Sequence, residues 1–110
     1  MKRLSPIHAH PNELAVRALL AAAGLPVADL TAAHLDDFWG CDDGANLIGV
    51  VGLEIYGTVA LLRSLAVAPD GQGRGLGAAL LAHAERAARQ RGIATLLERH
   101  LYGTVGTGGH

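Results

Sequence analysis

The stretch "LAVAPDGQGRGLGAALLAHAERAARQRG", residues 65–92, decides the fold, because an apolar run leads through a glycine-rich turn into an amphipathic helix. Four glycines stand within seven residues of that turn. Glycine costs about 0.5–1 kcal/mol relative to alanine in regular structure, so the turn is expected to need its backbone freedom. The first N–H groups of a helix lack intrahelical acceptors and carry partial positive charge. The turn is therefore predicted to hold phosphate, with Arg74 adding a positive side chain.

Hydrophobic periodicity predicts the elements on either side of this turn. A long helix is expected over residues 75–91, because Leu76, Leu80 and Ala84 recur at helical spacing and can face a sheet. A short strand, "ATLLE" at 94–98, follows it. Ahead of the turn, two runs rich in Val, Ile and Leu flank "YGT", which predicts an antiparallel hairpin of residues 47–56 with residues 59–67.

Three further segments precede the hairpin: a helix at 11–24, a shorter helix at 29–38 and a polar loop "CDDGAN" at 41–46. Asp29 or Thr31 is expected to cap the shorter helix. The order helix, helix, hairpin, loop, helix, strand predicts an α+β fold with a mixed, mainly antiparallel sheet.

Composition excludes several classes of function. The 110 residues suggest one domain or part of one, and the formal net charge of −1 implies no polyanionic partner. Aromatic residues make up only 4% of the chain, so a surface for stacking nucleic acid bases is not expected. The single cysteine, Cys41, rules out an internal disulfide and favours a reducing compartment. With neither a signal peptide nor a membrane-spanning segment expected, the chain is predicted to be cytoplasmic. The scattered histidines predict no metal site.

Three nucleotide-binding motifs compete for the glycine-rich turn. The P-loop pattern fails, because no Lys-Ser or Lys-Thr pair follows the glycines. The dinucleotide pattern fits formally at Gly73, Gly75 and Ala78, with Glu98 at the spacing of an acidic ribose ligand. That pattern opens a parallel βαβ unit, however, whereas the strand here closes a hairpin. The third pattern, [QR]-x-x-G-x-[GA], is satisfied by "QGRGLG" at residues 72–77.

This third motif resembles the acetyl-CoA loop of the GNAT N-acetyltransferase superfamily, in the setting "LAV.P..QG.G.G..LL..A". The resemblance runs from about residue 11 to residue 97 and is strongest over 61–92. It implies α/β/α layers, acetyl-CoA as cofactor and a small-molecule primary amine as acceptor. The segments "GVVGLEIYG" and "ALLRSLAVAP" look like the branch of arsenic-resistance N-acetyltransferases, which implies an amino-acid-like or arsenic-containing amine.

The resemblance also assigns roles to individual residues. The pyrophosphate is implied to sit on backbone N–H groups of the loop, namely those of Gln72, Gly73, Arg74, Gly75, Leu76, Gly77 and Ala78. The pantetheine arm is implied to pair with the backbone of the preceding strand, at Leu65, Ala66 and Val67.

The acceptor chemistry needs a base that removes a proton from the attacking amine. Glu54 is the candidate, because it stands in an apolar run where desolvation favours the protonated carboxyl. The alternative is that Glu54 lies on the solvent face of its strand. Arg63 is a candidate for binding an acidic group of the substrate through its planar fork. Strand alternation predicts that Arg63 and Ser64 point to opposite faces. Tyr56 is expected to pack at the end of the hairpin.

The resemblance fails beyond residue 97. Residues 1–97 are interpreted as a partial acetyltransferase domain that lacks the C-terminal strands, and residues 98–110 as a disordered or aberrant tail. An open sheet edge there invites a homodimer. The competing interpretation of the whole chain is a catalytically inactive CoA-binding or interaction fragment.

Overall fold

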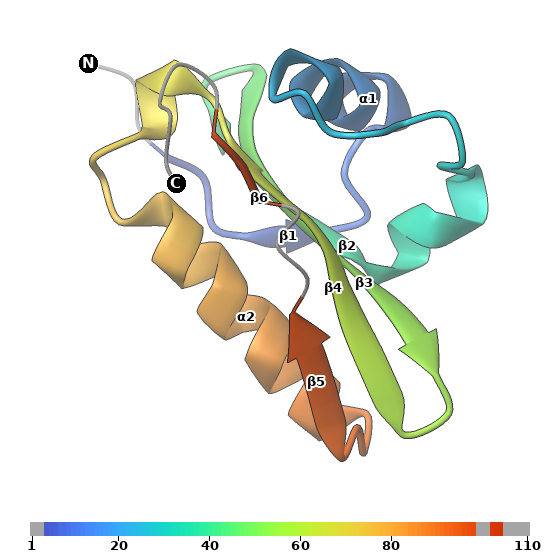
Figure 1. The fold of residues 1–110 in the computed structure, drawn as a ribbon. Helices are drawn as coiled ribbons and strands as arrows, with labels where there is room; N and C mark the ends of the chain where they lie inside the picture. Colours follow the sequence, from blue (N-terminus) through green and yellow to red (C-terminus); the bar gives the residue numbers. More distant parts are fainter. Residues whose placement is uncertain (1–3, 99–101, 105–110) are drawn as a thin grey trace.

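The computed structural model describes residues 4–98 and 102–104. The elements are β1 (His8–Ala9), α1 (Glu13–Ala22), η1 (Ala32–Asp37), β2 (Phe38–Asp43), β3 (Asn46–Tyr56), β4 (Val59–Val67), η2 (Pro69–Gly71), α2 (Leu76–Gln90), β5 (Thr95–Glu98) and β6 (Tyr102–Thr104). The strands form one sheet in the order β1-β2-β3-β4-β5, and β6 pairs separately with β4 (Figure 1). Pairing is antiparallel from β1 to β4 and parallel between β4 and its two C-terminal neighbours. The predicted mixed, mainly antiparallel sheet is therefore confirmed.

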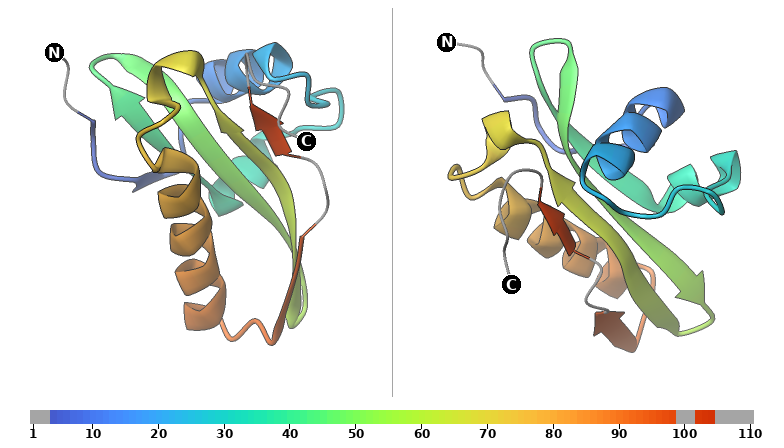
Figure 2. Two further views of the ribbon diagram at one scale, coloured as in Figure 1. Left: turned by 60° about the vertical axis from the view of Figure 1, so that its left-hand side comes forward. Right: turned by 45° about the horizontal axis from the view of Figure 1, so that its top comes forward.

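Helices cover both faces of the sheet, so the expected three layers are present. Helix α2 lies across one face, and α1 and η1 lie over the other (Figure 2). On the α2 side, Leu80 and Ala84 pack against a cluster that includes Val51. On the α1 side, Leu20 and Phe38 belong to a second cluster of fully buried side chains. The sheet is thus buried on both faces over its central strands.

Both predicted long helices form where the sequence signals place them. In α1, the Asn12 side chain accepts a hydrogen bond of 3.0 Å from the N–H of Ala15, which satisfies one of the orphan donors at the helix start. In α2, the apolar stripe is buried and the helix ends just before Gly92, whose φ of +79° suits glycine. Among the described residues, no helix is both long and apolar enough to cross a membrane.

Two segments ahead of the hairpin differ from prediction. Residues 41–43 of the expected loop belong to β2, because Cys41 is buried opposite Gly49 and the chain turns only at Gly44, with φ +65°. The shorter helix is a 3-10 helix over Ala32–Asp37 with Thr31 at its N-cap position. Asp29, the other expected cap, bonds instead to Arg63.

The expected tail also differs in part. Tyr102–Thr104 form β6, and its parallel register places them opposite Leu65 to Val67 of β4. The rest of that tail beyond Glu98 lies outside the described residues. The boundaries 1–97 and 98–110 remain predictions.

Candidate functional site

The glycine-rich turn borders a cavity of about 350 Å³ at the end of β4. Its lining is Val67, Gly71, Gln72, Gly73, Gly75, Leu76 and Gly77. All except Gly71 are residues to which the resemblance assigned cofactor contacts. Gly73 and Gly75 have φ of +78° and +73°, a backbone conformation that residues with a Cβ rarely adopt. Apart from the glycine itself and its two chain neighbours, no atom of the described residues lies within 4 Å of where a Cβ would stand at either position. The glycines therefore leave the backbone of the turn open to a ligand.

Helix α2 begins at this cavity. The first α-helical backbone bond runs from Ala79 N to Gly75 O at 3.1 Å, so the N–H groups of Leu76, Gly77 and Ala78 have no intrahelical acceptor. These donors and the positive end of the helix dipole make a site for an anion. The role of these three residues in holding a pyrophosphate stays a prediction.

The side chains of Gln72 and Arg74 bind other residues of the chain. The side-chain amide of Gln72 donates to the Val67 carbonyl at 3.2 Å and ties the turn to the end of β4. The N–H of Gln72 donates to the Pro69 carbonyl, also at 3.2 Å, whereas a role in binding pyrophosphate was predicted for it. Arg74 pairs with Asp43 of β2 at 3.3 Å, so its charge is offset and its side chain reaches β2. Both side chains brace the turn.

The edge of β4 predicted to bind pantetheine carries another strand. Leu65, Ala66 and Val67 pair with β3 on one side and with β6 on the other. A pantetheine arm and β6 therefore cannot pair with the outer edge of these residues at the same time.

A β-bulge interrupts the ladder next to this edge. Gly52 pairs with Ser64 and Leu53 with Leu62, so Arg63 is the extra residue of β4. Residues opposite each other in an antiparallel pair share a face, and a Cβ at Gly52 would meet the Phe38 ring on the α1 side. Ser64 therefore faces that side, as does Arg63, whose contacts lie there. The predicted alternation of Arg63 and Ser64 is wrong because the bulge resets the phase.

Arg63 is the centre of a polar cluster below α1 and η1. Its side chain is only 8% exposed; Nη1 lies 3.4 Å from Glu54 Oε2 and Nη2 lies 3.0 Å from Asp29 Oδ1. Its Nε is buried without a hydrogen-bond partner among the described residues. The hydrogen bond and charge of Arg63 lower the pKa of Asp29. Arg63 is thus a buried cation shared by two carboxylates.

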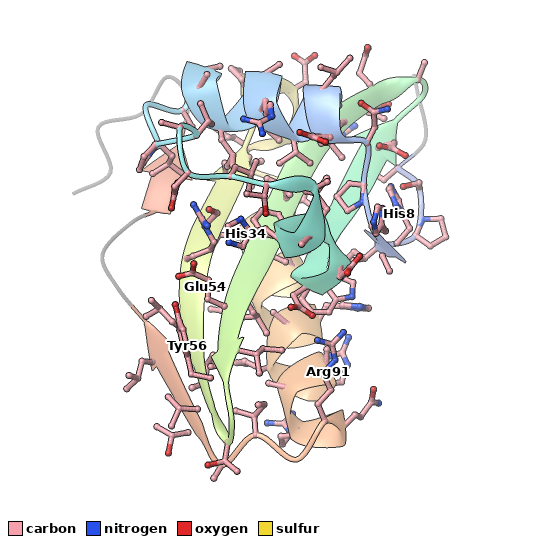
Figure 3. The ribbon with its side chains drawn as sticks, turned by 90° about the vertical axis from the view of Figure 1, so that its right-hand side faces the viewer. His8, His34, Glu54, Tyr56 and Arg91 are labelled. Atoms are coloured by element: carbon pink, nitrogen blue, oxygen red, sulfur yellow. The ribbon has the colours of Figure 1, made fainter. Side chains whose placement is uncertain are left out.

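Glu54 borders a second cavity, of about 220 Å³, between η1 and the sheet. The lining residues are Thr31, Ala33, His34, Asp37, Leu53, Glu54, Ile55 and Tyr56. Figure 3 shows Glu54 and Tyr56 following one another along the same face, with His34 beside Glu54. The Glu54 side chain is 23% exposed, which places it between the two alternatives of a buried base and a solvated residue. Tyr56, expected to pack, is 61% exposed and lines this cavity.

Sequence reasoning missed His34 and the pairing of Asp29. His34 Nε2 lies 3.8 Å from Glu54 Oε2. Its spacing from Thr31, three residues, is that of a capping box, and this signal could have identified it as a residue fixed by the backbone. Among the described residues no group of histidine, cysteine and acidic side chains could hold a metal ion.

The chain is similar to proteins of a known family and to several solved structures. Residues 9–103 match the model of the family described as "Acetyltransferase (GNAT) family". No curated protein matches the chain. The fold is similar to that of N-acetylglutamate synthase from Neisseria gonorrhoeae, solved with coenzyme A and N-acetyl-glutamate, with TM-score 0.73 and 26% identity. It is also similar to IAA acetyltransferase from Bacillus cereus, with TM-score 0.63 and 28% identity.

A third similar structure is the ribosomal-protein-S18-alanine N-acetyltransferase from Escherichia coli, with TM-score 0.64 and 21% identity, a likeness of fold alone. The alignments cover 89%, 86% and 86% of this chain in the order given. They cover 25%, 63% and 64% of the three relatives, so the chain spans less than two thirds of each.

Proposed function

The chain belongs to the GNAT acetyltransferase family, and from this premise we propose that it transfers an acetyl group from acetyl-CoA to the primary amine of a small molecule. The observation that carries the proposal is the cavity at the start of α2. Glycines in the left-handed conformation there expose backbone donors to a space of about 350 Å³. A negatively charged pyrophosphate fits a site with those donors and that dipole.

The turn and the edge of β4 define the orientation in which acetyl-CoA would bind. The N–H groups of Leu76, Gly77 and Ala78 would hold the pyrophosphate, and the outer edge of β4 would guide the pantetheine arm from Val67 towards the bulge. That path requires β6 to release Leu65, Ala66 and Val67. The path ends beside Arg63 and Glu54. There it meets the second cavity, between η1 and the sheet, which we call the acceptor cavity.

Glu54 is assigned the role of base. The amine nitrogen would attack the thioester carbonyl, so that a C–N bond forms, the C–S bond breaks and CoA leaves as the thiolate, which then takes up from solvent one proton, equal to the one that the amine gives up. Glu54 accepts the proton that the amine loses, and the cavity beside it has room for a small acceptor. Arg63 would hold an acid group of that acceptor, in exchange for the exposed Asp29 carboxylate. An amine that also carries an acid group, amino-acid-like or arsenic-containing, suits this pair of residues.

One observation favours the second candidate function, a CoA-binding or interaction fragment without catalysis. β6 occupies the edge that the pantetheine arm requires, and a chain in which it stays there could bind the pyrophosphate without presenting the thioester to Glu54. A homodimer and a cytoplasmic location also remain predictions.

The test is an acetyl-transfer assay with a panel of amines, in which release of free CoA thiol is followed. The proposal predicts turnover with primary amines that carry an acid group. It predicts none with the same amines after the acid group has been converted to an amide. CoA binding without turnover of any amine would favour the fragment.

A further inference from the structure

The imidazole of His34 is held by the chain at one of its nitrogens, Nδ1. The N–H of Thr31 donates to Nδ1 at 2.9 Å, so Nδ1 must present a lone pair. While Nδ1 accepts this bond it carries no proton, so the ring proton is on Nε2. The hydroxyl oxygen of Thr31 also lies close to this nitrogen, 3.3 Å from Nδ1. The start of η1 therefore sets the tautomer and the orientation of His34.

The protonated nitrogen faces the carboxylate of Glu54. His34 Nε2 is 3.8 Å from Glu54 Oε2, and Arg63 Nη1 is 3.4 Å from the same oxygen. Arg63 thus donates a hydrogen bond to Oε2, and His34 Nε2 approaches the same oxygen from η1, just beyond hydrogen-bond distance. Among the described residues none donates a hydrogen bond to Oε1, and Glu54 lines the acceptor cavity. The two oxygens of the Glu54 carboxylate therefore differ: Oε2 faces Arg63 and His34, and Oε1 does not.

We propose that His34 is a positioning residue: its Nε2–H, together with Arg63, engages Glu54 Oε2 so that Oε1 is presented to the acceptor amine. The inference rests on the proposed function, because it assumes that Glu54 receives the proton. A glutamate side chain has three rotatable bonds, and a base whose orientation is set in advance loses less entropy when the substrate binds. His34 itself touches neither the acetyl donor nor the reacting nitrogen in this scheme.

A purely structural role for His34, as the cap of η1, makes different demands on the side chain. The cap needs only an acceptor at the Nδ1 position, which asparagine supplies with its side-chain oxygen. The contact to Glu54 needs a donor at the Nε2 position, which glutamine supplies with its amide nitrogen. His34→Asn and His34→Gln therefore separate the two roles and serve as controls for each other.

The kinetic experiment compares these two variants in the full chain. Positioning predicts that His34→Asn lowers kcat about tenfold with the KM for acetyl-CoA unchanged, whereas His34→Gln keeps most of kcat. In a Glu54→Gln background, His34→Asn should lower kcat no further, because it acts through Glu54. The opposite order, with His34→Asn active and His34→Gln impaired, would overturn the assignment in favour of a cap alone.

A second measurement does not depend on activity. Long-range ¹H–¹⁵N NMR spectra of the full chain should show the His34 proton on Nε2 and a displaced Nε2 resonance in Glu54→Gln. A proton on Nδ1, or a spectrum unaffected by Glu54→Gln, would overturn the His34 assignment even if the enzyme is active. Absence of transfer by a chain with the predicted spectrum would instead overturn the proposed function, and with it the catalytic role of this contact.

Discussion

Arg63 Nη1 lies 3.4 Å from Glu54 Oε2, across a ladder in which Arg63 is the extra, unpaired residue. The bulge brings a buried cation and the candidate base to the same side of the sheet, below α1 and η1. A regular ladder would alternate the side chains of β4 and give the cluster a different composition. The contact between Arg63 and Glu54 therefore depends on one inserted residue.

Glu54→Gln tests the base. The amide keeps the shape of the side chain but cannot accept a proton, so kcat is expected to fall by about 10²-fold or more. The affinity for acetyl-CoA should stay unchanged, because the glycine-rich turn does not contact residue 54. Glu85→Gln on α2 is the matched control and should leave kcat unaltered. Equal activity of the two variants would remove Glu54 from the mechanism.

Arg63→Met tests the polar cluster as a source of stability. Removal of the guanidinium leaves the partly buried Glu54 carboxylate without its partner, and the free energy of unfolding is expected to fall by about 1–3 kcal/mol. Asp29→Asn should cost clearly less, because Asp29 is 67% exposed and its ion pair is open to solvent. Urea unfolding of both variants measures the difference. A larger loss for Asp29→Asn would contradict this account.

His83 gives the fold a pH dependence with a definite sign. The side chain packs on Trp39, with ring centroids 5.8 Å apart, and burial, followed by the charge of Arg86, lowers the pKa of His83. Below the ordinary histidine pKa of about 6.5, the unfolded chain then binds a proton that the folded chain does not, so stability falls as the pH falls. Between about pH 7.5 and about pH 5.5, His83→Gln should lose less unfolding free energy than the native chain. Parallel losses would show that His83 is not linked to folding.

Removal of β6 tests the competition for the edge of β4. A chain ending after Glu98 should bind acetyl-CoA about tenfold more tightly, because the ligand no longer has to displace β6 from β4. A tenfold change corresponds to the net free energy of about one or two backbone hydrogen bonds between strands. A chain ending after Thr104 keeps β6 and is the control, with the affinity of the full chain. Calorimetry distinguishes the two. Weaker binding after loss of β6 would mean that this strand supports the site.

The sequence predicted the parts of the molecule that depend on local periodicity. Helix α2, the β3–β4 hairpin and the glycine-rich turn follow from apolar spacing and turn residues, which act over a few neighbouring positions. β2 was missed because Asp42 and Asp43 are typical of loops. In the fold, His8 lies 3.0 Å from Asp42 and Arg74 lies 3.3 Å from Asp43, and these partners are distant in sequence.

The acceptor cavity was predicted only in part for the same reason. Glu54 and Arg63 could be selected as polar residues in apolar strands. The bulge that puts them on one face depends on how two strands align, and His34 reaches Glu54 only after η1 has packed on β3. Long-range register and packing of this kind leave no local pattern.

Binding of acetyl-CoA to the full chain, measured by calorimetry with NADH as a control, tests the central claim most directly. The account predicts that acetyl-CoA binds, that NADH does not, and that Gly77→Leu weakens acetyl-CoA binding about tenfold or more by filling the cavity. A Cβ at Gly77 would come no closer than 3.8 Å to Val67, so this variant should fold. Ala79→Leu, exposed on the same helix and outside the cavity lining, should bind like the native chain. Preference for NADH, or full affinity in Gly77→Leu, would contradict the assignment of the glycine-rich turn.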